Sequence, residues 1–432
     1  MTRDICVVVP TIREYDCLRA YAENAREHGF DLDRLHVLLV TEDFCDTDAM
    51  RAMLDEEGID GEVFDGTRRE QWYRERGVDS FAHLVPEASH AETSFGLLYM
   101  WANGFEYGVF VDDDTRPHPD YDFFGTHLSN LAFEGEVTGV RSDEQWVNVL
   151  YQNADEHGLY PRGYPYGAMG ESVETTPEYV EDVVASQGLW TNVPDLDAVR
   201  ILTDGDLQGQ AETRTTADDY GEDFVAAPGQ FLTVCSMNLA FRREVIPAFY
   251  QLPMDDNPWD VGRFDDIWSG VFLKRACDVL GKQVYNGAPL CEHDKAPRST
   301  FGDLANEVPG LELNEHLWEI VDDAVPAAEP SVRTEPDVAR ESHTFADGDG
   351  RALADGAGET FAGRDGEPFA DGDAASFAAV YRAMADALLA ADADYENADF
   401  LPYVGEHMHE WLDCLDALEP LAPTAEPAAA DD

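Results

Sequence analysis

Three consecutive aspartates, Asp112–Asp114, follow the short apolar run Val109–Val111. A buried strand that ends at a carboxylate cluster places that cluster at the carboxyl edge of a sheet, where open α/β sheets bind ligands. Adjacent carboxylates repel each other, and a hard divalent cation relieves the repulsion. Asp112 and Asp114 are therefore expected to hold a metal on the diphosphate of a nucleotide-sugar, with Asp112 and Asp113 also contacting the nucleotide. Solvated surface acids are the alternative, because a chain with 89 acidic residues contains such triplets by chance.

A histidine near the end of a later short strand, His293 in E-H-D-K, is the expected distant metal ligand. Carboxylate and imidazole together suit manganese better than calcium, so the expected cofactor is Mn²⁺ or, in its place, Mg²⁺. A structural histidine is the alternative. Lys295 lies two residues further on and is one of only three lysines in the chain. Because lysine is so rare here, we expect Lys295 to meet a phosphate as a compact charge.

Further candidates lie in three other segments. Arg162, in R-G-Y-P-Y, suits bidentate contact with phosphate or carboxylate. Asp265 and Asp266 begin an apolar helix. An N-terminal cap accounts for one of them, and the other is then free to accept sugar hydroxyls or act as a base. Trp190 and Asn192 could stack on and hydrogen-bond a sugar, with core packing as the alternative for Trp190.

The first third of the chain alternates between strand-like and helix-like segments, which predicts a parallel sheet with right-handed crossovers. The expected strands are 5–10, 35–40, 62–64 and 109–111, and the expected helices are 13–28, 47–57 and 93–103.

The second half is more mixed. We expect aromatic, turn-rich loops at 162–166 and 186–197, strands at 145–151, 232–241, 283–285 and 289–291, and helices at 242–251 and 265–280. Composition divides the chain into a nucleotide-sugar domain (1–324), an acidic low-complexity linker (325–373), a helical segment (374–419, with helices at 374–391 and 399–418) and a disordered tail (420–432).

The net charge of −61 excludes nucleic acid or anionic lipid binding through a general basic surface. Acids spread along a lysine-poor chain indicate adaptation to high salt, where screening removes self-repulsion. Seven cysteines without a C-x-x-C motif favour free thiols in a reducing compartment. Neither a secretory signal nor an apolar run of about 18 residues is present, so the sequence predicts a soluble cytoplasmic protein. Its oligomeric state stays open, with a homo-oligomer as one arrangement.

Together the motifs resemble those of the plant reversibly glycosylated polypeptides, the UDP-arabinopyranose mutase family, first described as alpha-1,4-glucan-protein synthase, UDP-forming; a haloarchaeal-type member is expected. The resemblance extends from about Ile5 to Pro297. Six phrases occur in family order: V-D-D-D at Val111, R-G-Y-P-Y at Arg162, S-Q-G-L-W-T-N-V-P-D-L-D at Ser186, C-S-M-N-L-A-F-R-R-E at Cys235, G-R-F-D-D-I-W-S-G at Gly262 and H-D-K-A at His293.

The resemblance implies an A-type glycosyltransferase fold, Rossmann-like with a mostly parallel sheet flanked by helices, and a manganese-dependent UDP-sugar site. Asp112–Asp114 and His293 would hold the metal and UDP. Three residues at the ends of the first two strands, Thr11, Arg13 and Asp43, would border the uridine. Arg162 matches the arginine that the family reports as reversibly glycosylated and needed for activity.

The family's mutase cleaves the anomeric bond to UDP, interconverts pyranose and furanose rings, and rejoins UDP. The family has a second arginine seven residues after the first, and here that position is Met169. Two other functions therefore stay open. One is a glycosyltransferase that passes a sugar to a separate lipid, protein or glycan acceptor, and the other is a non-catalytic UDP-sugar-binding subunit.

Overall fold

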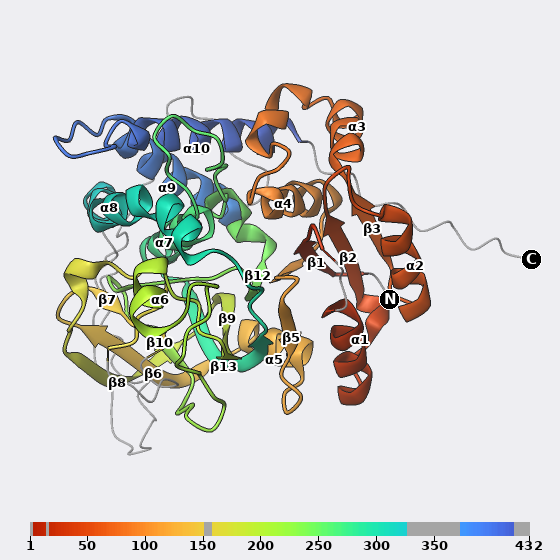
Figure 1. Ribbon diagram of the computed structural model, residues 1–432, viewed down its shortest axis with the longest axis horizontal. Coiled ribbons are helices and arrows are strands. Elements are labelled where there is room, and N and C mark those ends of the chain that lie inside the picture. The colour runs from red at the N-terminus through yellow and green to blue at the C-terminus, as the bar shows by residue number, and fades with distance from the viewer. Residues whose placement is uncertain (1–2, 14–16, 151–157, 326–371, 419–432) are drawn as a thin grey trace, which may run out of the picture.

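Four apolar runs near the N-terminus form adjacent parallel strands in the computed structural model (Figure 1). Their order across the sheet is β3–β2–β1–β4. The strands are β1 (Ile5–Pro10), β2 (Leu35–Val40), β3 (Gly61–Phe64) and β4 (Tyr107–Val111). The crossovers contain α1 (Cys17–His28), α2 (Thr47–Glu57), α3 (Gly66–Arg76), the short helix η2 (Asp79–Leu84) and α4 (Glu92–Asn103). Helices on both faces keep these strands buried, which explains their continuous apolar sequences.

The structure describes residues 3–13, 17–150, 158–325 and 372–418. Almost all of the predicted linker and the predicted tail lie outside these ranges, and so does the end of the strand expected at 145–151. The predicted division into domains therefore stays a prediction. The α/β fold with a mostly parallel sheet flanked by helices is confirmed in the described part of the chain.

The sheet continues beyond β4 in the order β4–β12–β9–β13–β10–β6–β8, with β5 paired to β13. Here antiparallel pairs enter, because β12 runs against both β4 and β9. These strands are β5 (Thr115–Pro117), β6 (Gly135–Ser142), β8 (Val173–Val180), β9 (Val183–Asn192), β10 (Phe224–Ala226), β12 (Asn238–Arg242) and β13 (Gln283–His293). A separate pair joins β7 (Trp146–Val147) and β11 (Phe231–Leu232).

Four predictions for this half were wrong, besides the helix at 242–251. Within its described residues, the strand expected at 145–151 is only the two-residue strand β7. The expected loop at 186–197 is largely strand β9, which is buried between β12 and β13. The expected strand at 232–241 is two strands, β11 and β12, separated by a turn. The segments 283–285 and 289–291 are parts of one strand, β13, whose irregularities near Gly287 and Pro289 shift its register against β9.

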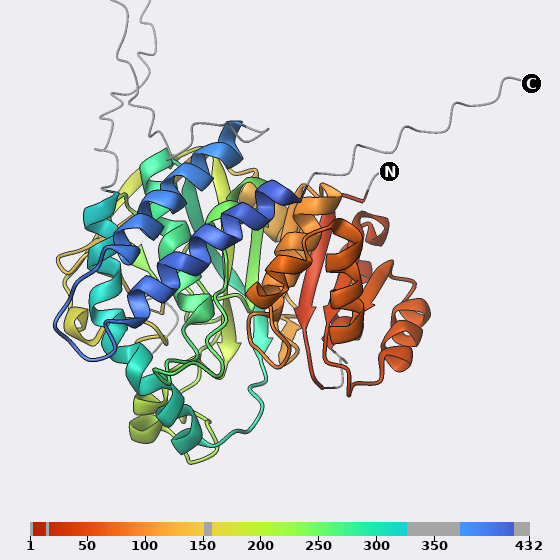
Figure 2. The same ribbon diagram turned by 90° about the horizontal axis from the view of Figure 1, so that it is seen from above.

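Helices complete the second half. They are α5 (Phe123–Leu131), α6 (Ala198–Asp204), α7 (Asp265–Leu280), α8 (Thr300–Ala324), α9 (Gly372–Leu389) and α10 (Phe400–Ala417), with the short helices η1 (Leu32–Arg34), η3 (Tyr166–Ala168) and η4 (Arg243–Ala248). The helix expected at 242–251 is only η4, because Pro247 lies inside it. Figure 2 shows α9 and α10 crossing one face of the molecule. They pack on η4, α7, α8 and η2.

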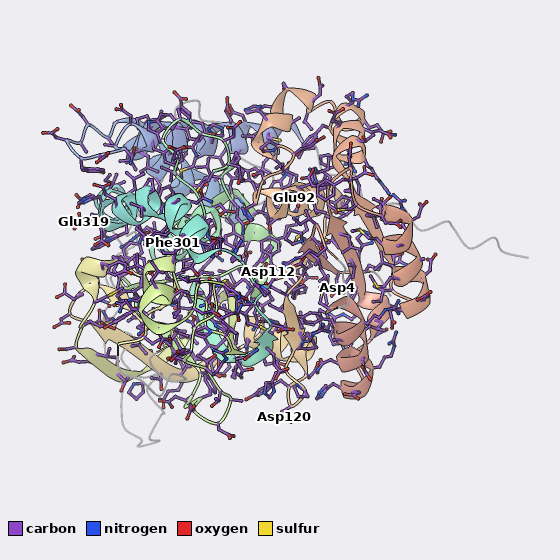
Figure 3. All side chains as sticks on the ribbon, viewed as in Figure 1. Asp4, Glu92, Asp112, Asp120, Phe301 and Glu319 are labelled. Carbon is purple, nitrogen blue, oxygen red and sulfur yellow. The ribbon has the colours of Figure 1, made fainter. Side chains whose placement is uncertain are left out.

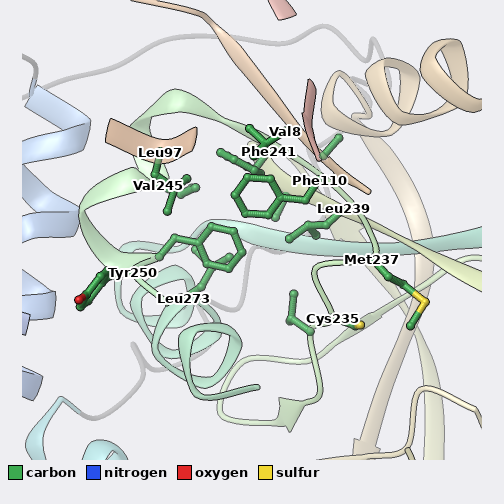
Figure 4. Close-up of a cluster of buried hydrophobic side chains, with 14 of the residues drawn as sticks. Val8, Leu97, Phe110, Cys235, Met237, Leu239, Phe241, Val245, Tyr250 and Leu273 are labelled. Atoms are coloured by element: carbon green, nitrogen blue, oxygen red, sulfur yellow. The ribbon is translucent and has the colours of Figure 1, made fainter. Parts of the chain in front are cut away.

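Aromatic and aliphatic side chains fill the core beneath β4 and β12 (Figure 4). The Phe110 ring meets the Phe241 ring edge-on, with centroids 4.8 Å apart. A Cβ atom on Gly108 would come within 2.3 Å of the Phe241 ring, so only glycine fits at that position. This packing fixes the position of β4, and therefore of the aspartates that follow it.

All seven cysteines are free thiols. No helix among the described residues is both long and apolar enough to cross a membrane.

Candidate active site

Strand pairing brings the end of β4 to the end of β13. After Val111 the chain turns at once, and Thr115 donates from both its backbone N–H (3.1 Å) and its hydroxyl (2.8 Å) to the carbonyl of Asp112. The short strand β5 then pairs with β13, with Thr115 opposite His293. As a result Asp114 lies beside the segment 293–296, and its Oδ1 is 3.8 Å from Nε2 of His293.

The Asp114–His293 pair has the donor chemistry of a divalent metal site. His293 donates from Nδ1 to the carbonyl of Val193 over 2.8 Å, so the Nε2 lone pair is directed toward Asp114. Burial lowers the pKa of His293 more than the charge of Asp114 raises it. The low pKa keeps the imidazole neutral, as a metal ligand must be. Asn192 donates to the carbonyl of His293 over 3.0 Å and helps to fix its backbone.

Among the described residues, no three His, Cys, Asp or Glu side chains converge as a complete metal cage. Mg²⁺ and similar ions are commonly held by one or two protein ligands together with substrate phosphates and water. Asp114 and His293 fit such a metal. Asp112, the third predicted ligand, makes no ion pair with His293 in the described part of the chain. Its carboxyl is half-buried near the middle of the molecule (Figure 3). Burial, together with the charges of Asp114 and Asp266, raises its pKa.

Asp113 joins the ends of β1 and β4. Its Oδ2 accepts from the Thr11 hydroxyl over 2.8 Å and from Nε of Arg13 over 3.1 Å. The structure therefore brings together Asp113 and two of the three residues predicted to border the uridine, Thr11 and Arg13. Asp43 follows β2 but accepts at 2.8 Å from the backbone N–H and the hydroxyl of Thr67, at the start of α3. No contact joins Asp43 to Asp113 in the described structure.

Arg162 is the centre of a buried ion-pair network. Its Nε donates to Oδ2 of Asp195 over 3.0 Å, and its two Nη atoms donate to the two oxygens of Asp266 over 3.1 and 2.8 Å. A further hydrogen bond runs from Nη1 to the carbonyl of Arg263. Burial alone would lower the pKa of Arg162, but Asp195 and Asp266 outweigh it and hold that pKa above its ordinary value.

Asp195 connects this network to the metal pair. Burial alone would raise its pKa, but Arg162, Lys295 and His293 together lower it. The ammonium of Lys295 lies 3.6 Å from Oδ1 of Asp195 and is almost fully buried. The sequence offered one signal for Asp195, an acidic residue between apolar neighbours in N-V-P-D-L-D, but that segment was expected to be a loop.

Asp265 and Asp266 both lie in the first turn of α7, and each has a different environment. Asp266 is occupied by Arg162. Asp265 is buried, and burial together with repulsion from Asp266 raises its pKa to about 6. A carboxyl with that pKa can gain or lose a proton near neutral pH, as a general acid or base must.

Trp190 does not have the predicted position. Its ring is buried in β9 with 2% of its surface exposed, so it offers no face on which a sugar could stack. Asn192 lies at the end of the same strand, with the left-handed backbone φ of 77°. Its amide binds the His293 carbonyl, so its observed contact is with the proposed metal ligand.

A second buried cluster of charged residues was not predicted from the sequence. Arg69, on α3, lies with one Nη 3.2 Å from Oε1 of Glu92 and the other 3.5 Å from Oε1 of Glu42, just beyond β2. Burial and a hydrogen bond to Glu42 raise the pKa of Glu92 to about 9. Three polar residues this far apart in sequence carry no local signature.

Known proteins similar to this chain fall into two groups. UDP-arabinopyranose mutase 1 of Arabidopsis thaliana is 29% identical over 321 residues, covering 73% of this chain and 77% of the relative. Probable UDP-arabinopyranose mutase 2 of Solanum tuberosum is 30% identical, covering 73% and 75%. Among solved structures, glucosyl-3-phosphoglycerate synthase of Mycobacterium tuberculosis is 16% identical with a TM-score of 0.35, covering 72% of this chain and 80% of that one.

Mannosyltransferase PcManGT of Pyrobaculum calidifontis is 13% identical with a TM-score of 0.36, covering 96% of this chain and 84% of that one. TM-scores of this size indicate only distant similarity, so the family assignment rests on the sequence. The profile of the family described as "Reversibly glycosylated polypeptide" matches residues 2–335. The chain therefore belongs to the reversibly glycosylated polypeptide family.

Proposed function

We propose that this protein is a metal-dependent UDP-sugar mutase that interconverts ring forms of a UDP-bound sugar. The observation that carries the proposal is the convergence of Asp114 with His293 beside the buried Arg162–Asp195–Asp266 network. Similarity to UDP-arabinopyranose mutases supports the same substrate class, and with it an enzyme of the mutase or glycosyltransferase kind.

We assign each group of residues in the site a separate role in the proposed reaction. Thr11, Arg13 and Asp113 border the nucleotide at the ends of β1 and β4. Asp114 and His293 would hold Mn²⁺ or Mg²⁺, which when bound neutralises charge on the departing diphosphate. Lys295 adds a buried positive charge beside Asp195. Asp265, with its pKa near 6, exchanges a proton with a sugar hydroxyl.

We assign Arg162 a positioning role. A guanidinium is a nucleophile only when it loses a proton, and the carboxylates of Asp195 and Asp266 stabilise the protonated form. Its bidentate contact fixes Asp266, and its contact with Asp195 fixes the loop after β9, in which the Val193 carbonyl accepts from His293. In this arrangement Arg162 holds the sugar side of the site in place, and we do not assign it the covalent step.

A transferase is the second candidate function. Met169 in place of the family's second arginine favours it, because that replacement removes a group from the mutase pattern without touching the metal pair. A transferase would pass the sugar to a separate lipid, protein or glycan acceptor.

We also propose a reducing, high-salt cellular setting. All seven cysteines are free, and 89 acidic residues against 28 Lys plus Arg give self-repulsion that only screening relieves.

The test begins with UDP binding. Wild-type protein should bind UDP more tightly with Mn²⁺ than without it, measured by calorimetry, and Asp114→Asn should lose that metal-dependent gain. Asp120→Asn, on the exposed turn after β5, is the matched control and should bind like wild type. Unchanged metal-dependent binding by Asp114→Asn would refute the metal assignment.

Turnover separates the candidate functions. Wild-type protein incubated with a panel of UDP-pentoses and UDP-hexoses should produce ring isomers that chromatography resolves. Sugar transfer to an added acceptor, without ring isomers, would replace the mutase by the transferase. Tight UDP binding without isomers, transfer or slow UDP release would leave a binding subunit.

A further inference from the structure

The side chain of Met169 ends against the guanidinium of an arginine from another element. Met169 follows η3, and its sulfur contacts Nη2 of Arg200 in the first turn of α6. This is the position at which the sequence departs from its family. A positive charge is therefore present beside position 169, although position 169 itself does not supply it.

Arg200 is held in place by aromatic rings and by the cap of its own helix. Its backbone N–H donates to Oδ1 of Asp197 over 3.0 Å. Its guanidinium carbon lies 5.5 Å from the ring centroid of Tyr160 and 5.3 Å from that of Tyr166. The Tyr166 hydroxyl donates to the same Asp197 carboxylate over 3.0 Å. These contacts fix the position of the charge without neutralising it.

Within the described ranges, no carboxylate oxygen lies within 4.0 Å of the Arg200 guanidinium nitrogens, and its buried Nε has no hydrogen-bond partner. By contrast, Arg162 and Arg263 each contact two carboxylates. Burial raises the pKa of Asp197 and the Arg200 charge works against that rise, but the guanidinium forms no ion pair with that carboxylate. The unpartnered Nε suits an oxygen of an anionic ligand.

The residues that hold Arg200 are sequence neighbours of the residues that hold Arg162. The Tyr160 ring beside it comes two residues before Arg162. Asp197, which caps α6, comes two residues after Asp195, which binds Arg162. The two guanidinium groups are thus held by the same pair of segments, 160–166 and 195–200.

We infer that Arg200 is a substrate-binding residue that supplies a second guanidinium to the sugar-diphosphate side of the site, in place of an arginine at position 169. The inference rests on the proposed UDP-sugar function. Because the Met169 side chain already reaches the Arg200 guanidinium, an arginine at position 169 can bring its own guanidinium to the same place, between the same rings.

The experiment uses the full chain and compares four variants with wild type. Arg200→Met should lower kcat/KM for the UDP-sugar at least tenfold and weaken UDP-sugar binding in calorimetry, while Arg200→Lys should retain part of both. The reciprocal variant Met169→Arg/Arg200→Met should recover kcat/KM to within about fivefold of wild type, the scale expected for one charge-assisted contact. Arg74→Met, an exposed arginine on α3, is the matched control and should change neither quantity.

Two results would overturn the inference: Arg200→Met with activity and binding within twofold of wild type, or a reciprocal variant no better than Arg200→Met. Circular dichroism and thermal unfolding of each variant identify any loss that comes from misfolding; recovery by the reciprocal variant also excludes it. A wild-type protein without UDP-sugar binding would instead refute the proposed function, so the two failures are distinguishable.

Discussion

Replacing Glu92 with Gln should stabilise the protein, and the gain should grow as the pH rises. Glu92 is 5% exposed and shares Arg69 with Glu42. Burial and the hydrogen bond to Glu42 raise its pKa from 4.5 to about 9, so the folded protein keeps the Glu92 proton at neutral pH. The unfolded chain releases that proton above pH 4.5. Stability therefore falls as the pH rises from 4.5 toward 9.

The size of the effect follows from the two pKa values. Between them, one retained proton costs about 1.4 kcal/mol of unfolding free energy per pH unit. Glutamine is neutral at every pH and can still donate to Glu42, so Glu92→Gln avoids this cost. Its advantage over wild type should widen by about 2.7 kcal/mol between pH 6 and pH 8.

Urea unfolding of both proteins at the two pH values, at one high salt concentration, measures this difference. The comparison cancels the titration of all other groups, and Glu75→Gln, at an exposed position on α3, should show no widening. If the stability difference between Glu92→Gln and wild type stays constant within 0.5 kcal/mol, about a fifth of the expected change, folded Glu92 does not keep its proton and the reasoning is refuted.

Two further predictions concern the site. If Asp265 acts as a base, kcat/KM should rise with pH to a plateau with a midpoint near 6, because only the deprotonated carboxylate accepts a proton; Asp265→Asn should lower activity and remove that limb. A pH profile that keeps the limb in Asp265→Asn would assign it to another group. Because Trp190 is buried in β9, Trp190→Phe should lower the unfolding free energy by about 1–3 kcal/mol and leave KM within twofold; a large KM change with unchanged stability would restore the stacking role.

The sequence predicted the elements whose signals are local. The helix at 265–280 begins with two acidic residues and ends before Gly281, whose φ of 68° forms a left-handed cap, and the structure has the same bounds. Strands β1, β2 and β4 were evident because fully buried parallel strands are continuous apolar runs. Helices α3, α5, α6 and α8 were not predicted.

Strand β9 was missed because its polar residues have partners that only the fold provides. Gln187 and Gly188 are typical of a turn in the sequence. In the structure, the Gln187 amide donates to Asn286 over 2.8 Å, and a Cβ atom on Gly188 would meet the Asn238 side chain at 2.4 Å. Both residues are therefore requirements of tertiary packing.

In the candidate site, too, residues with a local sequence signal were predicted and residues that depend on tertiary contacts were not. Asp114 and His293 were predicted because each follows a strand, and β5 places them together. Asp195 and Arg200, which we propose as parts of the site, were not predicted, because each contacts a residue about 30 positions away, Arg162 or Met169. A charge in an acid-rich sequence does not reveal which of its many opposites it will meet.

The helical hairpin formed by α9 and α10 has a consequence for how the protein is made. Trp411 stacks on Tyr250 with centroids 4.7 Å apart, and the Trp101 indole donates to the carbonyl of Leu415 over 3.2 Å. A ribosome that has synthesised the whole sheet has therefore not yet supplied the residues that cover this face. Until α10 emerges, the nascent chain leaves Tyr250 and Trp101 uncovered. We therefore expect chaperone binding and aggregation to occur mainly late in translation, before α10 has been made.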